Sequence, residues 1–555
     1  MQTRPFDPGH ALQQALALHR QGQLRDADKI YTRILKVSPD NFDALHLLAL
    51  VKADAKQMGE AYRLMRAALK VNPKVADAWA NFANVLHVLK RNDEALGAID
   101  KALALRPDDR VLIQQRGNAL LSLGRPADAL ACFDAALKAG HANPDSLNGR
   151  GLALAALGRT GDALAAFDAA LASTPLRADV LYNRANALLA LDRLGEAVAG
   201  FDRVLARAPN HAKAWLNRGR ALQSLNRPAE AVACFEKAIV LDRDDADAHF
   251  NLALALLSAG DYARGFREYE WRWKRTGMRP RKSSKPVWLG EFPPSGRTIL
   301  LQAEQGLGDT IQFVRYIPLL ARMGAKIALE VQPELNALLS GASGVACYAR
   351  GEPLPTFDLV CPLGSLPLAL KTTPATIPAD NPYLAPDQER LAQWRGRLSP
   401  LPGKRIAIAW AGHARHVNDR NRSLDLDLLA PLFDLVGLSF VSIQRDLRDG
   451  DTDKLARYPN VTHVGGELSD MADTAAVLAL SDLTLAVDTS VVHLAGALAR
   501  TCWVLLPFAA DWRWGVSGET NAWYPQARLF RQSALGDWPT VIARVRDALA
   551  QLAAA

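Results

Sequence analysis

The chain has 555 residues, of which 49% are hydrophobic and 22% charged. This composition is ordinary for a folded protein and excludes wholesale disorder. No apolar run approaches the ~18 residues of a membrane helix, and the N-terminus lacks the apolar region of a signal peptide. Five widely spaced cysteines without a CxxC pair fit neither a disulfide framework nor a zinc site, and they predict a reducing, cytoplasmic location.

The first half of the chain repeats one pattern every 34 residues. Alanine recurs at this spacing, at Ala27, Ala61, Ala95, Ala129, Ala163, Ala197 and Ala231. Four residues later comes a larger apolar side chain, at Tyr31, Met65, Ile99, Phe133, Phe167, Phe201 and Phe235. Another place is always small, at Ala49, Ala83, Gly117, Gly151, Ala185, Gly219 and Ala253, and prolines recur on the same grid, with His141 and Arg243 as departures. Small residues let two helices approach, the large residue fills the gap, and proline stops the second helix.

This pattern resembles the tetratricopeptide repeat, a helical hairpin. Taking Ala76 as a repeat start gives eight units that begin at residues 8, 42, 76, 110, 144, 178, 212 and 246, the last of them divergent. We therefore expect an all-α solenoid over 8–279 whose concave face suits extended peptides.

Asparagines recur on the first helix of several units and predict a peptide-binding ladder. They stand at two grid positions three residues apart, Asn81, Asn183, Asn217 and Asn251 with Asn84, Asn118 and Asn186. Amides can pair with both N–H and C=O of a bound backbone, largely independently of its sequence. The alternative is a row of solvated polar positions. The arrangement resembles the asparagine ladder of eukaryotic O-GlcNAc transferase, whose repeats hold the protein substrate, but Leu47, Gln115 and Gly149 interrupt it here.

The formal net charge of +8 comes from a single stretch. The basic residues between positions 272 and 285, where no acidic residue occurs, are Arg272, Lys274, Arg275, Arg279, Arg281, Lys282 and Lys285, and removing their seven charges leaves 8 − 7 = +1. The charge is therefore not a protein-wide field and gives little support to nucleic-acid binding. The stretch either steers an acidic ligand or stays solvated.

The second half predicts a two-lobed α/β domain. Strand-like runs at 298–302, 326–331, 357–361, 405–410, 438–443, 483–487 and 502–506 alternate with helical segments, which indicates parallel sheets. We expect a basic linker over 280–295, one Rossmann-like lobe over 296–385, an interlobe linker over 386–403, a second lobe over 404–536 and a closing helix over 537–555. Two doubly wound lobes that face each other place a ligand cleft at the carboxyl ends of their strands.

Two motifs fall at strand ends that we expect to face this cleft. Gly306-Leu307-Gly308-Asp309 follows the first strand and opens a helix, where its glycines permit a tight turn and close ligand approach. Asp309 is either a structural residue of the helix start or a functional carboxylate. The motif is not GxGxxG, so a nicotinamide site is not the natural interpretation.

The second motif runs from Asp488 to Ala497. A strand ends at Asp488, Thr489 or Ser490 caps the next helix, and His493 lies on its first turn. The exposed amides of such a helix start form an anion site. His493 lies close enough to reach a ligand bound there. A satisfied core histidine is the alternative.

Together the two motifs, GLGD and DTSVVHLAGAL, resemble those of bacterial heptosyltransferases, which are GT-B glycosyltransferases. NDRNRSL (418–424), DWRW (511–514), AWYP (522–525) and LFRQ (529–532) resemble bacterial tetratricopeptide-repeat glycosyltransferases, including flagellin-modifying enzymes. The resemblance implies a GT-B domain with Asp309 as catalytic base and with the donor contacts Asp488, Thr489, Ser490 and His493. The heptosyltransferase lysine after the first strand of the second lobe has no match, and its place is taken by Ala411-Gly412-His413 and by Arg420 and Arg422, so heptose is not implied.

The expected reaction moves a sugar from a nucleotide-linked donor to Ser or Thr of a polypeptide held by the repeats. Asp309 would deprotonate the acceptor, and Arg420, Arg422 and the helix start at Ser490 would stabilise the leaving phosphate. Gly306, Gly308, His413 and Trp512 complete the expected donor site, although Trp512 would alternatively only pack. No DxD motif or His cluster indicates a metal, so we expect metal-independent, inverting transfer with the nucleotide-sugar as co-substrate and no other cofactor.

Flagellin is an acceptor that the resemblance alone suggests. Two further functions are compatible with the sequence. The chain would otherwise be a non-enzymatic repeat adaptor with a degenerate transferase domain, or a transferase that builds a lipid-linked or envelope glycan while its repeats dock other enzymes. We expect no nucleic-acid partner and no membrane-spanning segment.

Overall fold

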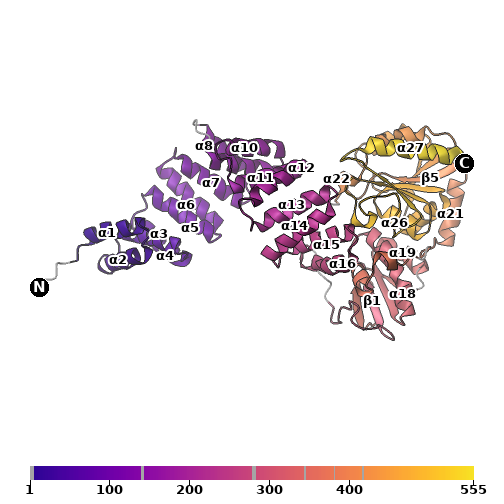
Figure 1. Cartoon of the computed structure of the whole chain (residues 1–555), viewed down its shortest axis with the longest axis horizontal. Helices are drawn as coiled ribbons and strands as arrows, with labels where there is room; N and C mark the ends of the chain where they lie inside the picture. Colours follow the sequence, from indigo (N-terminus) through magenta and orange to yellow (C-terminus); the bar gives the residue numbers. More distant parts are fainter. Residues whose placement is uncertain are drawn as a thin grey trace. The chain divides into compact units, whose positions relative to one another are not determined.

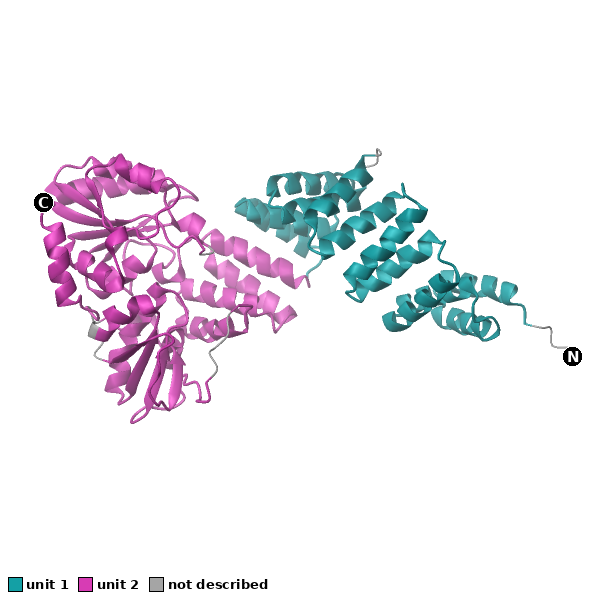
Figure 2. Ribbon diagram, turned by 180° about the vertical axis from the view of Figure 1, so that it is seen from behind, with its two compact units in different colours: residues 1–209 teal, residues 210–555 magenta. Residues whose placement is uncertain are grey.

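The computed structural model describes residues 6–138, 143–277, 283–342, 345–379, 382–415 and 418–554. His141 and the basic residues Arg279, Arg281 and Lys282 lie outside this described part. The chain divides into two compact units, residues 1–209 and 210–555 (Figure 2). The first unit is helical, and the second joins four more helices to two parallel sheets. An N-terminal tetratricopeptide-repeat array followed by an α/β region is the fold class predicted from the sequence, and it is confirmed.

Helices in antiparallel pairs make up the array (Figure 1). The first unit contains α1 (Pro8–Arg20), α2 (Leu24–Val37), α3 (Phe42–Asp54), α4 (Met58–Val71), α5 (Ala76–Val88), α6 (Asn92–Leu105), α7 (Arg110–Ser122), α8 (Pro126–Leu137), α9 (Pro144–Ala156), α10 (Thr160–Ser173), α11 (Ala178–Ala190) and α12 (Leu194–Leu205). The second unit continues with α13 (Ala212–Ser224), α14 (Pro228–Leu241), α15 (Ala246–Ser258) and α16 (Tyr262–Tyr269). Each first helix begins at the residue where the 34-residue grid begins a unit. The last pair is shorter because α16 gives way to a 3-10 turn at Glu270–Lys274.

Glycines and phenylalanines form the packing unit of the array. A Cβ atom added to Gly117 would lie 2.8 Å from the ring of Phe133, and one added to Gly151 would overlap the ring of Phe167. Phe133 and Phe167 are fully buried. The ring of Phe133 also fills the space beside Gly149 in the next repeat. Gly149 therefore interrupts the asparagine ladder because a side chain there would collide with this ring.

We expect Gly151→Ala to lower the free energy of unfolding by about 1–3 kcal/mol, because the added methyl group overpacks a filled interior. Gly97→Ala is the matched control, since Gly97 also lies within a helix but has open space around it. That change should raise stability by up to about 1 kcal/mol through helix propensity. Urea denaturation of the full-length chain, followed by circular dichroism, measures both. Equal effects of the two substitutions would contradict this packing unit.

Two parallel sheets form the lobes of the second unit. The first sheet has the order β3-β2-β1-β4 and contains β1 (Thr298–Gln302), β2 (Lys326–Val331), β3 (Ala346–Ala349) and β4 (Leu359–Pro362). The second has the order β10-β9-β8-β5-β6-β7 and contains β5 (Lys404–Ala409), β6 (Leu438–Ser442), β7 (Val461–His463), β8 (Leu483–Val487), β9 (Cys502–Leu506) and β10 (Ala527–Arg531). The order reverses beside β1 and beside β5, and crevices for ligands lie at the carboxyl ends of strands at such points.

Helices cover these sheets and connect their strands. Those that matter for the site are α17 (Leu307–Phe313) after β1 and α26 (Ser490–Ala497) after β8. The others are α18 (Ile317–Arg322), α19 (Pro333–Ala342), α20 (Leu366–Ala369), α21 (Gln388–Leu398), α22 (Asp419–Arg422), α23 (Ala430–Phe433), α24 (Asp451–Ala456), α25 (Met471–Leu480) and α27 (Trp538–Ala554). None of the helices in the described parts of the chain combines the length and apolar character that crossing a lipid bilayer requires.

The last repeat packs directly on both lobes. One hydrophobic core extends from Leu257 of α15 through the first lobe to Trp523 of the second. The indole N–H of Trp523 donates a hydrogen bond of 3.0 Å to the hydroxyl of Tyr262 in α16. In the seventh repeat, the Asn226 amide donates to the carbonyl of Val516 at 2.8 Å. Repeats seven and eight are thus part of the same folded unit as the α/β lobes.

Arg272 joins the end of the array to the first lobe and is fully buried. Its guanidinium donates to Glu270 Oε1 at 2.6 Å, to Ser365 Oγ at 2.7 Å and to Glu304 Oε1 at 3.1 Å. Neither role predicted for the basic stretch, steering of a ligand or solvation, holds for this residue. The burial of this guanidinium is tolerated because two carboxylates and a hydroxyl accept from its Nη1 and Nη2 groups.

We expect a fragment of residues 210–555 to fold alone, whereas a fragment of residues 283–555 should aggregate. The shorter fragment loses α16, which leaves Trp523 uncovered and Glu304 without the buried cation that compensates its charge. Size-exclusion chromatography and the temperature dependence of near-UV circular dichroism compare the two. A 283–555 fragment that is monomeric and unfolds at the same temperature as 210–555 would contradict the shared core.

Candidate functional site

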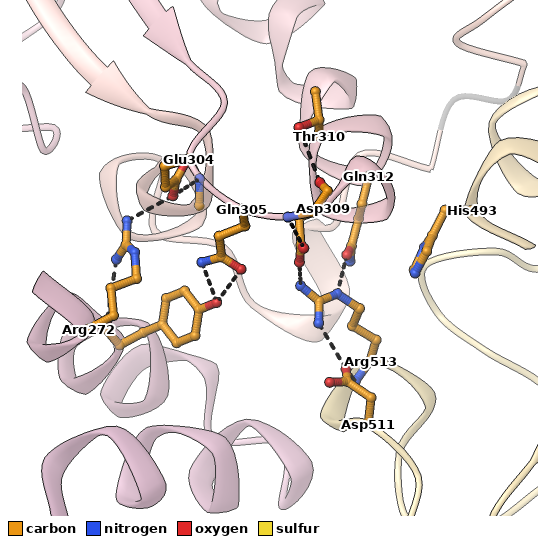
Figure 3. A network of polar contacts seen from close by, with 12 residues as sticks. Arg272, Glu304, Gln305, Asp309, Thr310, Gln312, His493, Asp511 and Arg513 are labelled. Atoms are coloured by element: carbon orange, nitrogen blue, oxygen red, sulfur yellow. Dashed lines mark hydrogen bonds and ion pairs between the residues drawn. The ribbon is translucent and has the colours of Figure 1, made fainter. Parts of the chain in front are cut away.

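The two sequence motifs meet where the starts of α17 and α26 face each other. A Cβ atom added to Gly308 of α17 would lie 2.7 Å from the His493 ring and 3.4 Å from Ser490 Cα. The glycine therefore permits a contact between the lobes that any side chain would obstruct. Figure 3 shows Asp309 and Gln312 of α17 beside Arg513 and His493 of the second lobe. Residues separated by more than 180 positions in the sequence lie together here.

Both oxygens of the Asp309 carboxylate have partners. Oδ2 accepts the backbone N–H of Gly306 at 3.0 Å, a contact that closes the first turn of α17. Oδ1 accepts a hydrogen bond from the guanidinium of Arg513. The side chain is 25% exposed. Asp309 thus has the structural role at the helix start that the sequence allowed, and it still presents a quarter of its surface for chemistry.

Arg513 is a residue of this site that the sequence analysis missed. It lies between two tryptophans in the turn Trp512–Trp514 and is 9% exposed. Besides Asp309, its guanidinium contacts Asp511 at 2.9 Å and the side-chain carbonyl of Gln312. Burial alone would lower the pKa of Arg513, but the carboxylates of Asp511 and Asp309 raise it. Arg513 lies within the DWRW segment. The sequence feature that could have identified it is the aspartate two residues earlier, Asp511, with which it pairs.

His493 is buried, with 6% of its surface exposed. Nδ1 lies 3.0 Å from the hydroxyl of Tyr524, Nε2 lies 3.9 Å from Asp488 Oδ1, and the ring stacks on Trp514. Burial, reinforced by the positive charge of Arg513, lowers the pKa of His493 well below its usual value. The imidazole is therefore neutral at physiological pH and is able to exchange donor and acceptor roles with a neighbouring group.

Asp488 is the second perturbed group of the site. Burial raises its pKa to about 6, and the nearby charge of Asp511 adds to the effect. Its backbone carbonyl accepts a hydrogen bond of 2.9 Å from Arg422. Thr489 is the N-cap residue of α26, but its side chain makes no capping bond and its buried hydroxyl has no partner among the described residues. The Thr489 hydroxyl is thus a buried polar group without a described partner at the start of α26.

Of the other residues predicted to contact the donor, one lies beside the site, two are exposed and one is buried in the core. Arg422 lies against Gly412, where a Cβ would come within 2.5 Å of its guanidinium, and it reaches the site through Asp488. Arg420 and His413 are exposed on the same lobe. Trp512 is 4% exposed and packs edge-on against Tyr262. The structure thus places Trp512 in the core with α16, which was the alternative considered for it, and donor binding by these residues stays a prediction.

Tyr269, the last residue of α16, brings the array to the site. Its hydroxyl exchanges hydrogen bonds with the side chain of Gln305, the residue before the GLGD motif, at 2.6–2.9 Å. Burial raises the pKa of Tyr269 to about 12, and the charge of Asp309 contributes. In the sequence this segment is recognisable only as a departure from the repeat pattern. At this departure the array is hydrogen-bonded to the residue that precedes the GLGD motif.

Side chains of the asparagine ladder pair with polar groups of neighbouring helices. The Asn81 amide lies 3.1 Å from His46 Nε2, and the Asn183 amide donates to Asn148 Oδ1 at 2.9 Å, each across 35 residues. Asn251 instead donates to a carbonyl of its own helix. Among the others, Asn84 and Asn118 are exposed, whereas Asn186 and Asn217 are half-buried. Their binding of a peptide stays a prediction.

The described ranges bring no three His, Cys, Asp or Glu side chains into an arrangement that holds a metal ion. The charged groups gathered around the two motifs are the carboxylates of Asp309, Asp488 and Asp511 and the guanidiniums of Arg422 and Arg513. Such a set can transfer a proton and stabilise an anion.

Comparison with known proteins identifies the repeats. Four overlapping segments match the tetratricopeptide repeat family, residues 115–178, 149–212, 182–233 and 216–275, and residues 20–102 match anaphase-promoting complex, cyclosome, subunit 3. Protein FlbA of Caulobacter vibrioides is 26% identical over 333 residues, which cover 54% of this chain and 54% of FlbA. The chain thus matches about half the length of this relative.

Solved repeat proteins are similar to part of the chain. A tetratricopeptide repeat protein from Parabacteroides merdae is 17% identical, with a TM-score of 0.39, over 45% of this chain and 98% of its own. YrrB, described as a repeat protein with an unusual peptide-binding site, is 27% identical, with a TM-score of 0.28, over 33% of this chain and 95% of its own. These matches concern repeats, and the transfer chemistry stays a prediction.

The raised pKa of Asp488 predicts a pH-dependent effect of Asp488→Asn. The folded chain holds this proton up to a pKa of about 6, whereas the unfolded carboxyl releases it near ~3.9. The stability that the proton confers is present below the unfolded pKa and is lost as pH rises through about 6. Asp488→Asn should therefore be more stable than the wild type at pH 7.5, by up to about 3 kcal/mol, and no more stable at pH 4.

Thermal unfolding of both chains between pH 4 and 8 measures this difference. Asp434→Asn is the control, because Asp434 is exposed on the same lobe, and its substitution should leave the difference constant over this range. An Asp488→Asn gain that does not depend on pH would show that the carboxylate is not desolvated.

Proposed function

We propose that the chain is a glycosyltransferase that moves a sugar from a nucleotide-linked donor to a serine or threonine of a polypeptide held by the repeats. The observation that carries the proposal is the meeting of the two motifs. The two motifs follow strands of separate sheets, yet Gly308, next to Asp309 in the first lobe, lies against Ser490 and His493 of the second. A cleft between two doubly wound lobes is a place where such folds bind nucleotides.

Asp309 is proposed as the general base. It would take the proton of the acceptor hydroxyl as the acceptor oxygen bonds to the anomeric carbon and the bond from that carbon to the donor phosphate breaks. The nucleoside diphosphate leaves with the bonding electron pair, and the configuration at the anomeric carbon inverts. Each carboxylate oxygen accepts at two positions, so the contacts with Gly306 and Arg513 leave room for the acceptor hydroxyl.

The second lobe is proposed to hold the donor. The amides at the start of α26, the hydroxyl of Thr489, which has no partner among the described residues, and the guanidinium of Arg422 are hydrogen-bond donors gathered at one strand end. Such groups stabilise the charge that develops on a leaving phosphate. The neutral imidazole of His493 is suited to a hydroxyl of the sugar or nucleotide. No metal enters this proposal.

The repeats are proposed to hold the acceptor, since tetratricopeptide arrays commonly bind polypeptides along their surface. Flagellin remains the suggested acceptor, on the resemblance alone. A reducing, cytoplasmic location is proposed because all five cysteines are free thiols. The attachment of the last repeat to both lobes supports a polypeptide acceptor over an envelope glycan, because it brings the end of the array to Asp309.

A second candidate is a non-enzymatic adaptor. Two observations favour it: the matched relatives identify repeats, and the carboxylate expected to act as base is held by Arg513. In that case the α/β lobes would serve as a folded scaffold for the array.

The proposal predicts that a nucleotide-sugar stabilises the full-length chain and that Asp309→Asn strongly reduces transfer. Thermal shifts with UDP-, GDP-, ADP- and CMP-linked sugars identify the donor. Mass spectrometry of proteins from cells with and without the gene identifies the acceptor. Loss of the general base should reduce modification about 10²–10⁴-fold.

Glu334→Gln is the matched control, an exposed carboxylate on α19 of the same lobe, and should leave modification unchanged. The adaptor function is favoured instead if no nucleotide-sugar shifts the melting temperature and Asp309→Asn leaves partner assembly and the modified proteins unaltered.

A further inference from the structure

Asp309 is held from both lobes at once. Its own lobe supplies the N–H of Gly306, and the opposite lobe supplies the guanidinium of Arg513. Figure 3 shows the dashed contacts that converge on this carboxylate from α17 and from the turn Trp512–Trp514. One contact exists whenever α17 is folded, whereas the other exists only when the lobes lie together.

Arg513 is itself fixed before it reaches Asp309. Asp511 accepts from its Nη1 at 2.9 Å and from its backbone N–H at 3.0 Å, and Gln312 accepts from its Nε. The amide of Asn521 donates to its carbonyl at 2.6 Å. The guanidinium also lies over the ring of Trp512, 4.5 Å from its centroid. Backbone and side chain are thus both anchored, which leaves the guanidinium little freedom to turn away.

The charges around Arg513 indicate what this residue does. One guanidinium faces two carboxylates, Asp309 and Asp511, so it carries no unbalanced positive charge for the phosphate of a ligand. Its geometry is instead that of an orienting group, because the planar fork of arginine serves several acceptors in fixed directions. The buried amide nitrogen of Gln312 has no partner among the described residues. The side-chain carbonyl of Gln312 thus accepts a hydrogen bond from Arg513, and its amide nitrogen is a donor without a described partner.

We infer that Arg513 is a positioning residue for Asp309, and that closure of the lobes is what places this carboxylate for reaction. The catalytic part of this inference, that Asp309 reacts with the acceptor, rests on the proposed function. Asp511 and Gln312 orient Arg513, and Arg513 orients Asp309. A lysine at position 513 offers a single ammonium and cannot hold Asp309, Asp511 and Gln312 in one plane.

The experiment uses the full-length chain carrying Arg513→Gln, Arg513→Lys, Asp309→Asn or the double substitution Asp309→Asn/Arg513→Gln. Arg528→Gln is the matched control, an arginine of the same lobe paired with Glu519 but 45% exposed. Amide hydrogen exchange of α17 reports whether the segment is held. Modification of cellular proteins in cells that express each variant, measured by mass spectrometry and normalised to the amount of chain, reports the reaction.

Arg513→Gln should speed exchange of the α17 amides about tenfold or more, and Arg528→Gln should leave exchange unchanged. Modification should fall about tenfold or more with Arg513→Gln and less with Arg513→Lys. Because Arg513 acts through Asp309, the double variant should be no worse than Asp309→Asn alone. A purely structural role would make the two losses add.

The inference is overturned if Arg513→Gln leaves α17 exchange at the wild-type rate, or if it retains wild-type modification. It is also overturned if the double variant loses clearly more than Asp309→Asn. Cells with and without the gene that contain the same modified proteins would refute the proposed function instead. Hydrogen exchange then still decides whether Arg513 holds Asp309.

Discussion

The close approach of α17 and α26 is the constraint on which the rest of the site depends. Gly308 lets the two helix starts touch, and this contact determines how far Arg513 reaches from one lobe toward Asp309 on the other. It also covers His493, and burial is the first cause of the pKa shifts of His493 and Asp488. A single missing side chain thus sets the electrostatics as well as the geometry of the site, because charges out of water interact more strongly.

The starts of the first helices of the repeats were predictable from the sequence, because the information that specifies them is local and repeated. Each hairpin solves the same packing problem, so a 34-residue spacing of small and large side chains reveals it. The α/β lobes were predictable in their central strands and in one edge strand, β4, all of whose residues are buried. The three strands that the sequence did not reveal, β3, β7 and β10, are the other edges of the two sheets. Edge strands are short and covered on fewer sides, so they lack the continuous apolar runs by which central strands are recognised.

The site was predictable where chemistry concentrates in one segment. GLGD and DTSVVH are each typical of a strand end followed by a helix start, and in the structure the two motifs lie against each other. Tyr269 and Arg513 escaped notice because their roles come from partners 36 and 204 residues away. Arg272 was misread for a similar reason, since charge in a basic stretch is usually solvated and only its distant partner Glu304 shows otherwise. A single sequence does not display such pairings.

Repeats seven and eight have a consequence for modularity. Solenoids usually gain and lose repeats freely, because each unit contacts only its neighbours. Here that freedom ends at residue 209, since the eighth repeat shares a core with the lobes and the seventh donates a hydrogen bond from Asn226 to Val516. Before this point a hairpin can be duplicated or deleted without breaking contacts to the lobes. After it, such a change would break those contacts. The length of the array is thus free to drift in evolution while the pair of hairpins beside the α/β lobes stays fixed.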